Sequence, residues 1–328
     1  TDHTELFVTA QQAMDVIPKL PLIYDEPFAD SSQIPTFLVS QLAKQHVTVS
    51  LSGDAGDELF CGYNRYLFVN KFWKLLSALP LSFRDILANG ITSISPTLWD
   101  QFPKYLLPKS LRLASIGDKL HKGAIALTSK SVDELYCRMV SHYSDMGDIV
   151  IGGNEHQTFL TKNAPSLTAL SAVERMMVLD LLTYLQDDIL TKVDRAAMSV
   201  SLETRTPFLD HRIIEFAWQL PMKFKIKNGQ SKWVLRQILN KYVPAELTKR
   251  PKMGFGIPID SWLRGPLRDW AEDLLNENRL KQEGFFNPAP IRLKWDEHIS
   301  GQRNWQYHLW DVLMFQAWRI SVNESKIV

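Results

Sequence analysis

The feature that most constrains the fold is the stretch 47–58, where a β-branched run meets a loop of small residues. Residues 47–51 (VTVSL) predict a strand, and the glycines that follow it allow a tight turn. Asp57 and Glu58 then open an apolar segment that predicts a helix start. Open α/β sheets bind their ligands where a strand leads through such a loop into a helix. The sequence therefore predicts an α/β fold with a ligand site at this loop.

Three carboxylates, those of Asp54, Asp57 and Glu58, lie within this short loop. A cation would relieve their mutual repulsion, and Mg²⁺ usually binds one or two carboxylates together with substrate phosphates. A site for a nucleotide with Mg²⁺ is therefore one interpretation. The alternative is that Asp57 and Glu58 only complement the positive end of a helix, and the spacing leaves both open.

Composition limits the functional classes. The 328 residues are 45% hydrophobic and 22% charged, as in an average soluble protein, and suffice for a large core or two domains. The 37 basic and 36 acidic residues give no electrostatic footprint for nucleic acid. Two cysteines indicate neither a disulfide framework nor a thiolate metal site. Since no apolar run approaches a membrane span and no signal peptide is visible, we expect a cytoplasmic protein without membrane or nucleic-acid partners.

Most of the remaining chain predicts helices. Helices are expected over 11–17 and 36–45, separated by a polar loop over 24–35. Short amphipathic helices are expected over 71–165, and one buried helix over 169–202, because apolar residues cover most of its circumference. The charged end of that helix, residues 187–195, either lies at a ligand site or forms a local ion-pair network.

A second group of candidates follows residue 210. Asp210 is expected to cap one helix and Ser231 the next, which places Lys232 in a first helical turn. The helix dipole disfavours a cation there unless an anion is bound, so Lys232 is a candidate phosphate ligand, although exposed lysines at such positions are common. Residues 249–256 combine glycines with cations, among them Lys252, and predict a loop whose backbone can approach an anion.

Four segments, taken in order, resemble one known family. They are 51–63 (LSGDAGDELFCGY), 187–210 (which contains DRAAM and LETRTPFLD), 231–236 (SKWVLR) and 250–255 (RPKMGF). Together they are similar to the synthetase domain of glutamine-hydrolysing asparagine synthetases, which are ATP pyrophosphatases. The resemblance implies an adenine-nucleotide-hydrolase-like parallel sheet within a mostly helical α/β domain.

The resemblance also implies a reaction in two steps. The side-chain carboxylate of aspartate attacks the α-phosphate of ATP, with Mg²⁺ as the metal, to give an aspartyl-adenylate and pyrophosphate. Ammonia, supplied from glutamine by a separate glutaminase domain, then displaces AMP. The small-molecule partners are therefore aspartate, ATP and ammonia.

Site residues follow from the same resemblance. Ser52 and Gly53 would contact the nucleotide, and Asp57 would ligate Mg²⁺. Lys232 and Lys252 would bind the phosphates and neutralise the departing pyrophosphate, with Lys252 also assigned to catalysis.

Asp54 would be the catalytic base that handles the proton lost when ammonia attacks. The chain departs from the family here, because well-studied members have Glu at this position. Ala55 stands where Gly is common, and residues 31–32 are serines near the place where some members have an arginine for the substrate carboxylate. A related adenylating amide ligase for another carboxylate, or a non-catalytic nucleotide-binding module, therefore stays open.

One domain is expected over 1–328, divided into 1–70, 71–165, 166–265 and 266–328. The phosphate loop Ser-Gly-Gly-x-Asp-Ser that the family places earlier does not occur in the chain, which starts at Thr1 without an initiator Met. We therefore expect a C-terminal fragment that is inactive by itself. An exposed sheet edge invites pairing with another chain, so a homodimer is a further expectation.

Overall fold

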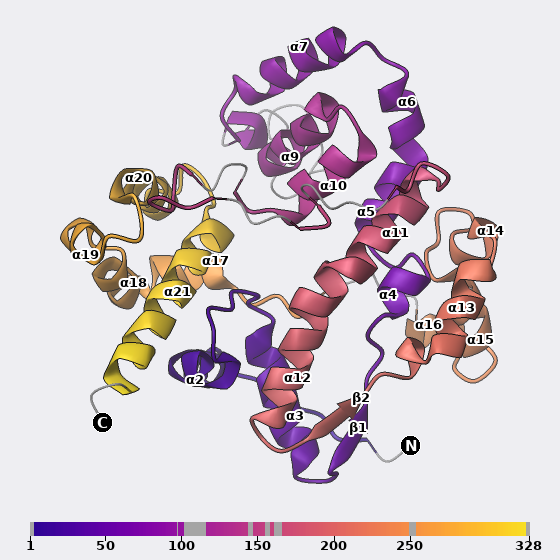
Figure 1. The fold of residues 1–328 in the computed structure, drawn as a ribbon, viewed down its shortest axis with the longest axis horizontal. Coiled ribbons are helices and arrows are strands. Elements are labelled where there is room, and N and C mark those ends of the chain that lie inside the picture. Colours follow the sequence, from indigo (N-terminus) through magenta and orange to yellow (C-terminus); the bar gives the residue numbers. More distant parts are fainter. Residues whose placement is uncertain are drawn as a thin grey trace. The chain divides into compact units, whose positions relative to one another are not determined.

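The computed structural model describes residues 3–96, 98–101, 116–143, 147–154, 158–160, 166–248 and 254–325. Its elements are mostly helices, and the strands in these ranges form one small parallel sheet (Figure 1). The mostly helical α/β class predicted above is thereby confirmed. None of the helices in the described ranges combines the length and apolar character that crossing a bilayer requires.

The chain forms two compact units. The first contains Thr1–Leu67, Met177–Pro258 and Leu313–Val328, and the second contains Phe68–Met176 and Ile259–Val312. Each unit is thus assembled from segments that are distant in sequence. The candidate residues of the described ranges belong to the first unit.

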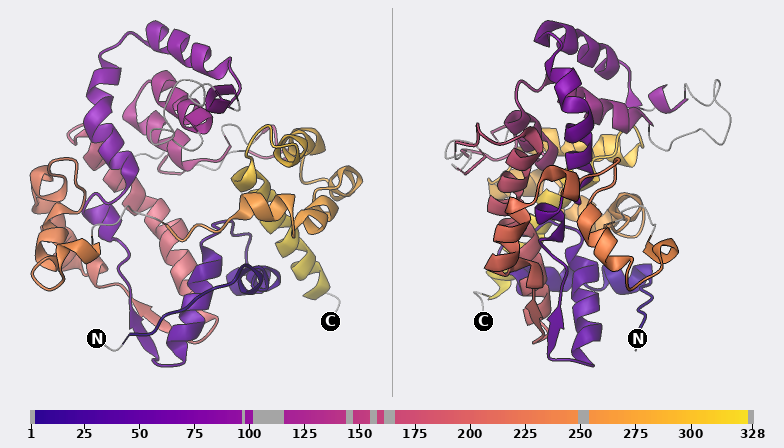
Figure 2. Two further views of the ribbon diagram at one scale, coloured as in Figure 1. Left: turned by 180° about the vertical axis from the view of Figure 1, so that it is seen from behind. Right: turned by 90° about the vertical axis from the view of Figure 1, so that its right-hand side faces the viewer.

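The sheet of the first unit pairs β1 (Val49–Leu51) with β2 (Glu203–Arg205), and the strands lie side by side in Figures 1 and 2. Val49 is in register with Glu203, and the N–H of Ser52 extends the ladder by donating to the carbonyl of Arg205 at 2.9 Å. The strand predicted over 47–51 is confirmed for its last three residues. β2 was not predicted, because its polar sequence has no β pattern of its own.

Most of the first unit outside this sheet is helical. α3 (Gln33–Lys44) and α12 (Thr191–Met198) pack against each other, and α12 also contacts β2 and α2 (Leu20–Tyr24). The other helices that lie within the first unit are α1 (Ala10–Met14), α4 (Gly56–Leu59), α13 (His211–Gln219), α14 (Met222–Lys225), α15 (Trp233–Leu239) and α16 (Ala245–Thr248). The predicted cap of α13 is confirmed, because the Asp210 carboxylate accepts from the N–H of Arg212 at 2.9 Å.

The helix predicted over 169–202 is not continuous. α11 (Ala172–Leu182) ends before a π-helical segment, η4 (Tyr184–Leu190), and α12 follows. Side chains bridge five residues in this segment: Gln186 donates to the carbonyl of Leu181 at 3.0 Å, and Thr191 donates to that of Gln186 at 2.9 Å. Apolar periodicity alone could not predict this wider turn, which frequently occurs at functional sites.

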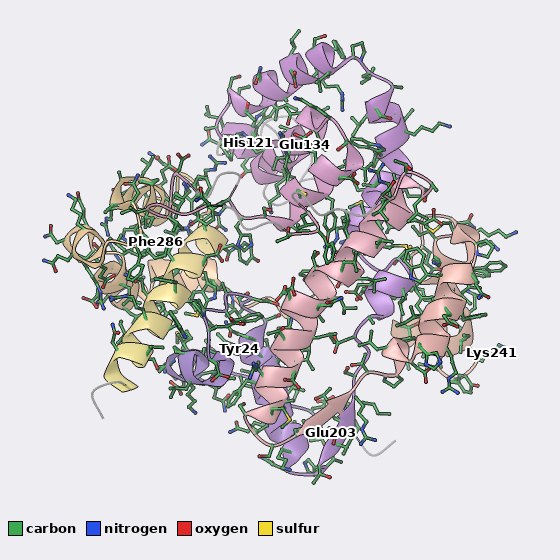
Figure 3. All side chains as sticks on the ribbon, in the orientation of Figure 1. Tyr24, His121, Glu134, Glu203, Lys241 and Phe286 are labelled. Carbon is green, nitrogen blue, oxygen red and sulfur yellow. The ribbon has the colours of Figure 1, made fainter. Side chains whose placement is uncertain are left out.

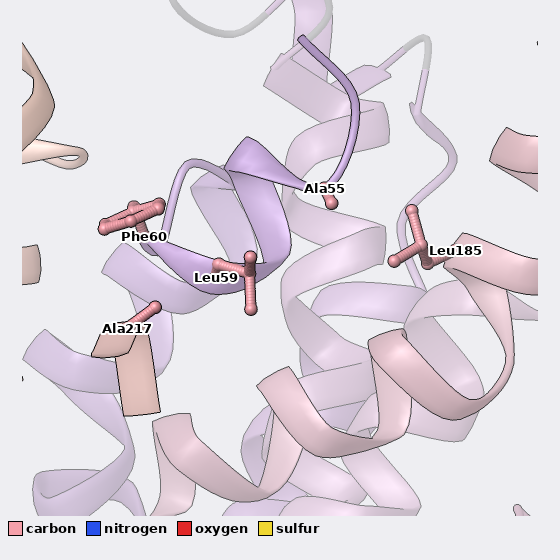
Figure 4. Packing of buried hydrophobic residues seen from close by; sticks show 5 residues of the cluster. All are labelled: Ala55, Leu59, Phe60, Leu185 and Ala217. Atoms are coloured by element: carbon pink, nitrogen blue, oxygen red, sulfur yellow. The ribbon is translucent and has the colours of Figure 1, made fainter. Parts of the chain in front are cut away.

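A hydrophobic cluster connects the loop after β1 to these helices (Figure 4). Ala55, Leu59 and Phe60 are buried against Leu185 of η4 and Ala217 of α13. The loop is therefore supported by packing on one side, which fixes where its polar side chains emerge.

The second unit is helical in its described part. α7 (Leu81–Thr92) packs against α9 (Ile116–Thr128), which also contacts α10 (Val132–Val140). α17 (Ile259–Arg264) packs against α18 (Arg268–Leu274) and α20 (Pro288–Ile299), with α19 (Glu277–Glu283) beside α20. The remaining elements are α6 (Lys74–Ser77) with the π-helical η2 (Val69–Trp73). Three helices have residues in both units: α5 (Asn64–Phe68), α11 and α21 (Gln306–Ser325).

Candidate active site

Ser52 and Gly53 lie at the carboxyl end of β1, the position at which parallel sheets bind ligands. The Ser52 hydroxyl is 3.1 Å from that of Thr206, which follows β2. A Cβ built on Gly53 would meet nothing within 4 Å, so the backbone there is open to approach. The geometry suits contact with a ligand, and the nucleotide role of both residues stays a prediction.

The backbone around this loop is strained at three residues other than glycine. Ala55, Cys61 and Lys232 have φ values of 65°, 59° and 51°, which lie in the left-handed region. Such a conformation costs about 1–3 kcal/mol for a residue with a Cβ, and it persists only where the surroundings enforce it. Ala55 precedes α4 and Cys61 follows it. Lys232 precedes α15, and its N–H binds the carbonyl of Phe60 at the end of α4. The three strained residues therefore lie around α4.

Asp57 of α4 and Lys232 form an ion pair. The Lys232 Nζ lies 3.0 Å from the Asp57 Oδ1, and the two side chains are 29% and 25% exposed. The backbone N–H of Lys232 donates to the carbonyl of Phe60 at 3.1 Å, which holds the lysine close to the end of α4. Two candidates that are far apart in sequence are therefore brought into direct contact.

Gly62 makes this contact sterically feasible. A Cβ built on Gly62 would lie 1.7 Å from the Asp57 Oδ1 and 2.3 Å from the Lys232 Cε. The N–H of Gly62 also donates to the carbonyl of Asp57 at 2.8 Å. Both partners of the ion pair thus pack against the bare Cα of this glycine, and any larger residue would have to push them away.

The predicted cap at Ser231 is wrong. α15 begins at Trp233, with Lys232 as its N-cap residue and no side-chain hydrogen bond at the cap. Lys232 therefore does not lie in a first helical turn. What positions its ammonium is the carboxylate of Asp57, which is a tertiary contact that a local capping rule cannot reveal.

The three carboxylates of the loop do not share one cation. Asp57 is paired with Lys232, whereas Glu58 is 1% exposed and accepts a hydrogen bond from the Tyr63 hydroxyl at 2.5 Å. Burial raises the pKa of Glu58, and the hydrogen bond from Tyr63 opposes this only in part. Asp54 lies half-buried in the turn before α4. Among the described residues no group of three His, Cys, Asp or Glu could hold a metal ion.

The donor set of Asp57 fits Mg²⁺ only in company with phosphates. Mg²⁺ is usually held by one or two carboxylates plus substrate oxygens rather than by a cage of protein ligands. Asp57 supplies one such carboxylate, and a cation, the Lys232 ammonium, already lies against one of its oxygens. Lys252, the other predicted phosphate ligand and catalytic residue, lies outside the described residues, as do all of 249–253.

A buried polar cluster beside the loop was not predicted from the sequence. Arg65 donates from Nε at 3.2 Å and from Nη2 at 2.5 Å to the carboxylate of Asp180, which is fully buried and also accepts from Tyr66. The Arg65 guanidinium lies 4.0 Å from the ring centre of Tyr63, the residue that binds Glu58. A single acid within the apolar stretch of α11 was the available signal, because a buried carboxylate requires a partner.

The charged end of the central helix forms long-range ion pairs with the polar loop over 24–35. The Lys192 Nζ lies 2.6 Å from the Asp30 Oδ2, and the Arg195 Nη1 lies 3.0 Å from the Asp25 Oδ2. The hydroxyl of Tyr24, labelled in Figure 3, donates to the carbonyl of Lys192 at 3.2 Å. Of the two interpretations given above, the ion-pair network is the one that these contacts support.

The Asp30 carboxylate has partners besides Lys192. It also accepts from the N–H and the hydroxyl of Ser32 at 2.8–2.9 Å. Burial acts to raise the pKa of Asp30, but the charge and hydrogen bond of Lys192, with the hydrogen bonds from Ser32, outweigh burial and lower the pKa.

The chain is similar to known proteins of one family. The family model for asparagine synthase matches residues 1–320. Asparagine synthetase [glutamine-hydrolyzing] 1 of Bacillus subtilis (strain 168) is 27% identical over 332 residues, which are 97% of this chain and 47% of that protein. A putative asparagine synthetase [glutamine-hydrolyzing] of Mycobacterium bovis is 32% identical over 334 residues, covering 99% and 47%. The human asparagine synthetase [glutamine-hydrolyzing] is 31% identical over 135 residues, covering 36% and 24%.

The chain thus spans about half the length of the curated bacterial relatives that it matches. The family match covers both units and both partners of the Asp57–Lys232 pair. The chain belongs to the asparagine synthase family.

Proposed function

We propose that this chain carries the synthetase site of an ATP-dependent, amide-forming ligase that converts aspartate to asparagine. The observation that carries the proposal is the Asp57–Lys232 pair at the carboxyl end of β1. It offers one carboxylate for a divalent cation and one ammonium for phosphate oxygens, side by side, which is the charge arrangement that a nucleotide–Mg²⁺ complex requires. Membership of the asparagine synthase family supports the choice of reaction.

In the first proposed step an oxygen of the aspartate side chain attacks the α-phosphorus of ATP. The bond from that phosphorus to the bridging oxygen of the β-phosphate breaks, and pyrophosphate leaves with the electron pair. Ser52 and Gly53 would hold the nucleotide by their position at the strand end, and Lys232 and Lys252 would stabilise the leaving charge. Mg²⁺, held by Asp57 and the phosphates, would neutralise phosphate charge.

In the second proposed step ammonia attacks the acyl carbon of the adenylate, and the bond from carbon to the AMP oxygen breaks. The nitrogen must lose a proton, and Asp54 is the proposed base. Its neighbour Glu58 is unsuited to that role, because it is 1% exposed and its carboxyl binds the Tyr63 hydroxyl. The names of the relatives specify glutamine hydrolysis; for this chain we propose the same ammonia source, in a further domain of a cytoplasmic enzyme.

The test is pyrophosphate release by the native protein that contains this chain, with ATP, Mg²⁺, aspartate and ammonium. We expect release to require both aspartate and Mg²⁺, and Lys232→Met to lower kcat/KM about tenfold to a hundredfold, because one charged hydrogen bond contributes about 1.5–3 kcal/mol. Lys241→Met is the matched control, since it removes the same charge from an exposed position of the same unit (Figure 3).

The outcome also separates the alternatives. Release that responds to another carboxylate but not to aspartate would assign the chain to a different adenylating ligase. Binding of ATP without release under any acceptor would assign it to the class of nucleotide-binding modules. Equal activity of the Lys232→Met and Lys241→Met proteins would remove the phosphate role of Lys232.

A further inference from the structure

We propose that the Lys232 ammonium acts as a built-in substitute for the divalent cation. In the ligand-free chain it neutralises Asp57, and it exchanges this carboxylate for phosphate oxygens only when the metal arrives together with phosphates. The site would therefore bind the metal–phosphate complex and discriminate against the free metal ion. This inference rests on the proposed function, because it assumes that the ligand is a metal–phosphate complex.

The position of the Lys232 ammonium is fixed. Lysine side chains are flexible, but Lys232 is restrained at both ends. Its backbone N–H binds the carbonyl of Phe60. Its Cε packs so closely against Gly62 that a Cβ built there would lie only 2.3 Å from it. The backbone of Lys232 has a φ of 51°, a left-handed conformation that lysine rarely adopts. A strained residue that is locked against one carboxylate indicates that the contact has a function beyond chain folding.

The charge of Lys232 opposes a free metal ion. The ammonium lies 3.0 Å from the Asp57 Oδ1, so a divalent cation that approached the same carboxylate would be repelled by it at short range. Phosphate oxygens change this balance, because they offer the ammonium a new acceptor and supply the metal with further ligands. Metal and phosphates together are therefore favoured over the metal alone.

The Asp57–Lys232 pair is partly exposed to solvent. Both side chains of the pair are partly exposed, at 25% and 29%, but the Asp57 Oδ1 that faces Lys232 is itself buried. A ligand can therefore reach the ammonium and the exposed part of the carboxylate without unfolding the loop. Gly62 is a positioning residue in this arrangement, because only a glycine lets Asp57 and Lys232 pack against the same Cα. A pair that served folding alone would not need this open, sterically tight geometry.

The experiment measures binding of Mn²⁺ by electron paramagnetic resonance, with the free ion and with its pyrophosphate complex as the two probes. The native protein is compared with Lys232→Met, with Lys232→Gly and with the exposed control Lys241→Met. Lys232→Gly guards against misfolding, because glycine relaxes the left-handed backbone at φ 51° while removing the ammonium. Thermal unfolding of each protein verifies that it is folded.

We expect both Lys232 variants to bind free Mn²⁺ about fivefold more tightly than the native protein, since a partly exposed ion pair contributes at most about 1 kcal/mol. The same variants should bind the Mn²⁺–pyrophosphate complex at least tenfold more weakly, because a charged hydrogen bond to phosphate is lost. The control should match the native protein with both probes. Adding Asp57→Asn to Lys232→Gly should abolish the gain for free Mn²⁺.

Two results would overturn the inference: unchanged or weaker binding of free Mn²⁺ by the Lys232 variants, or a gain that persists without the Asp57 carboxylate. Failure of the proposed function has a different signature. In that case no protein in the set would bind the pyrophosphate complex, while the gain for free Mn²⁺ would still report that Lys232 stands in for the metal.

Discussion

Asp30–Lys192 and Asp57–Lys232 join the same two functional groups within one unit, but their surroundings differ. In the first pair the Nζ–Oδ2 distance is 2.6 Å, the lysine side chain is 9% and the aspartate side chain 22% exposed, and Ser32 donates two further hydrogen bonds to the carboxylate. In the second pair the Nζ–Oδ1 distance is 3.0 Å, and both side chains are about a quarter exposed.

The difference shows how two Asp–Lys ion pairs can have different roles, one structural and one at a candidate site. The Asp30 carboxylate already accepts from Lys192 and Ser32, and its lysine is nearly buried, so Asp30–Lys192 anchors the polar loop to α12. A carboxylate and an ammonium that solvent can reach, held by strained backbone, can exchange partners at low cost. Burial and hydrogen bonding, rather than residue type, therefore decide which ion pair is structural.

The strongest test of this comparison is Lys192→Met. Removing one partner of a largely buried ion pair leaves an uncompensated charge and costs about 3 kcal/mol of unfolding free energy, whereas Lys232→Met should cost less than about 1 kcal/mol. Urea denaturation of both variants measures the two losses. Equal losses would remove the distinction between the pairs.

The pH dependence of the Lys192→Met loss sharpens the same point. Because the pKa of folded Asp30 lies below its ordinary value of 3.8, its stabilisation is present above that pH and disappears as the pH falls through the lower, folded pKa. The stability difference between native and variant proteins should therefore shrink in acid below pH 3.8.

A smaller effect is expected at Glu58, the buried carboxyl that has a hydroxyl rather than a cation as its partner. Since burial raises its pKa above the ordinary 4.5, the folded state retains a proton that the unfolded state loses, and stability falls as the pH rises from 4.5 through the folded pKa. Glu58→Gln keeps an oxygen for the Tyr63 hydroxyl and cannot ionise. Its unfolding free energy should lack this decline; a decline as steep as in the native protein would assign it to another group.

The smallest effect is expected at Asp25→Asn, which breaks the second ion pair between the same loop and the same helix. The Asp25 and Arg195 side chains are 71% and 46% exposed, and exposed pairs contribute about 0.5 kcal/mol or less. Asparagine also tolerates the left-handed backbone at φ 59°. Thermal unfolding should be almost unchanged, and a loss comparable to that of Lys192→Met would mean that burial is not the deciding factor.

Local patterns predicted those parts of the fold that depend on local forces. The β-branched run became β1, and Asp210 caps α13, because both follow from side chains a few residues apart. β2 could not be predicted, since Glu203–Arg205 is a strand only through its pairing with β1. Ser231 failed as a cap because the tertiary contacts of Lys232 set the helix start.

The sequence could name candidate site residues, but it could not predict the contacts that they make with one another. The motif resemblance singled out Asp57 and Lys232, and the structure brings them together, but no sequence pattern indicated that they would neutralise each other. The cluster of Arg65 and Asp180 was not predicted either, because its members are far apart in sequence and come into contact only in the folded protein.

The left-handed backbone of Ala55, Cys61 and Lys232 also has a consequence for engineering this chain. Lys232, whose side chain is partly exposed, would gain stability from glycine, which adopts positive φ without strain, whereas Ala55 and Cys61 are buried and glycine there would leave a gap in the core. A screen that selects variants for heat resistance alone therefore favours Lys232→Gly and discards the ammonium that the proposed chemistry needs. At Lys232, selection for thermal stability and selection for turnover therefore favour different residues.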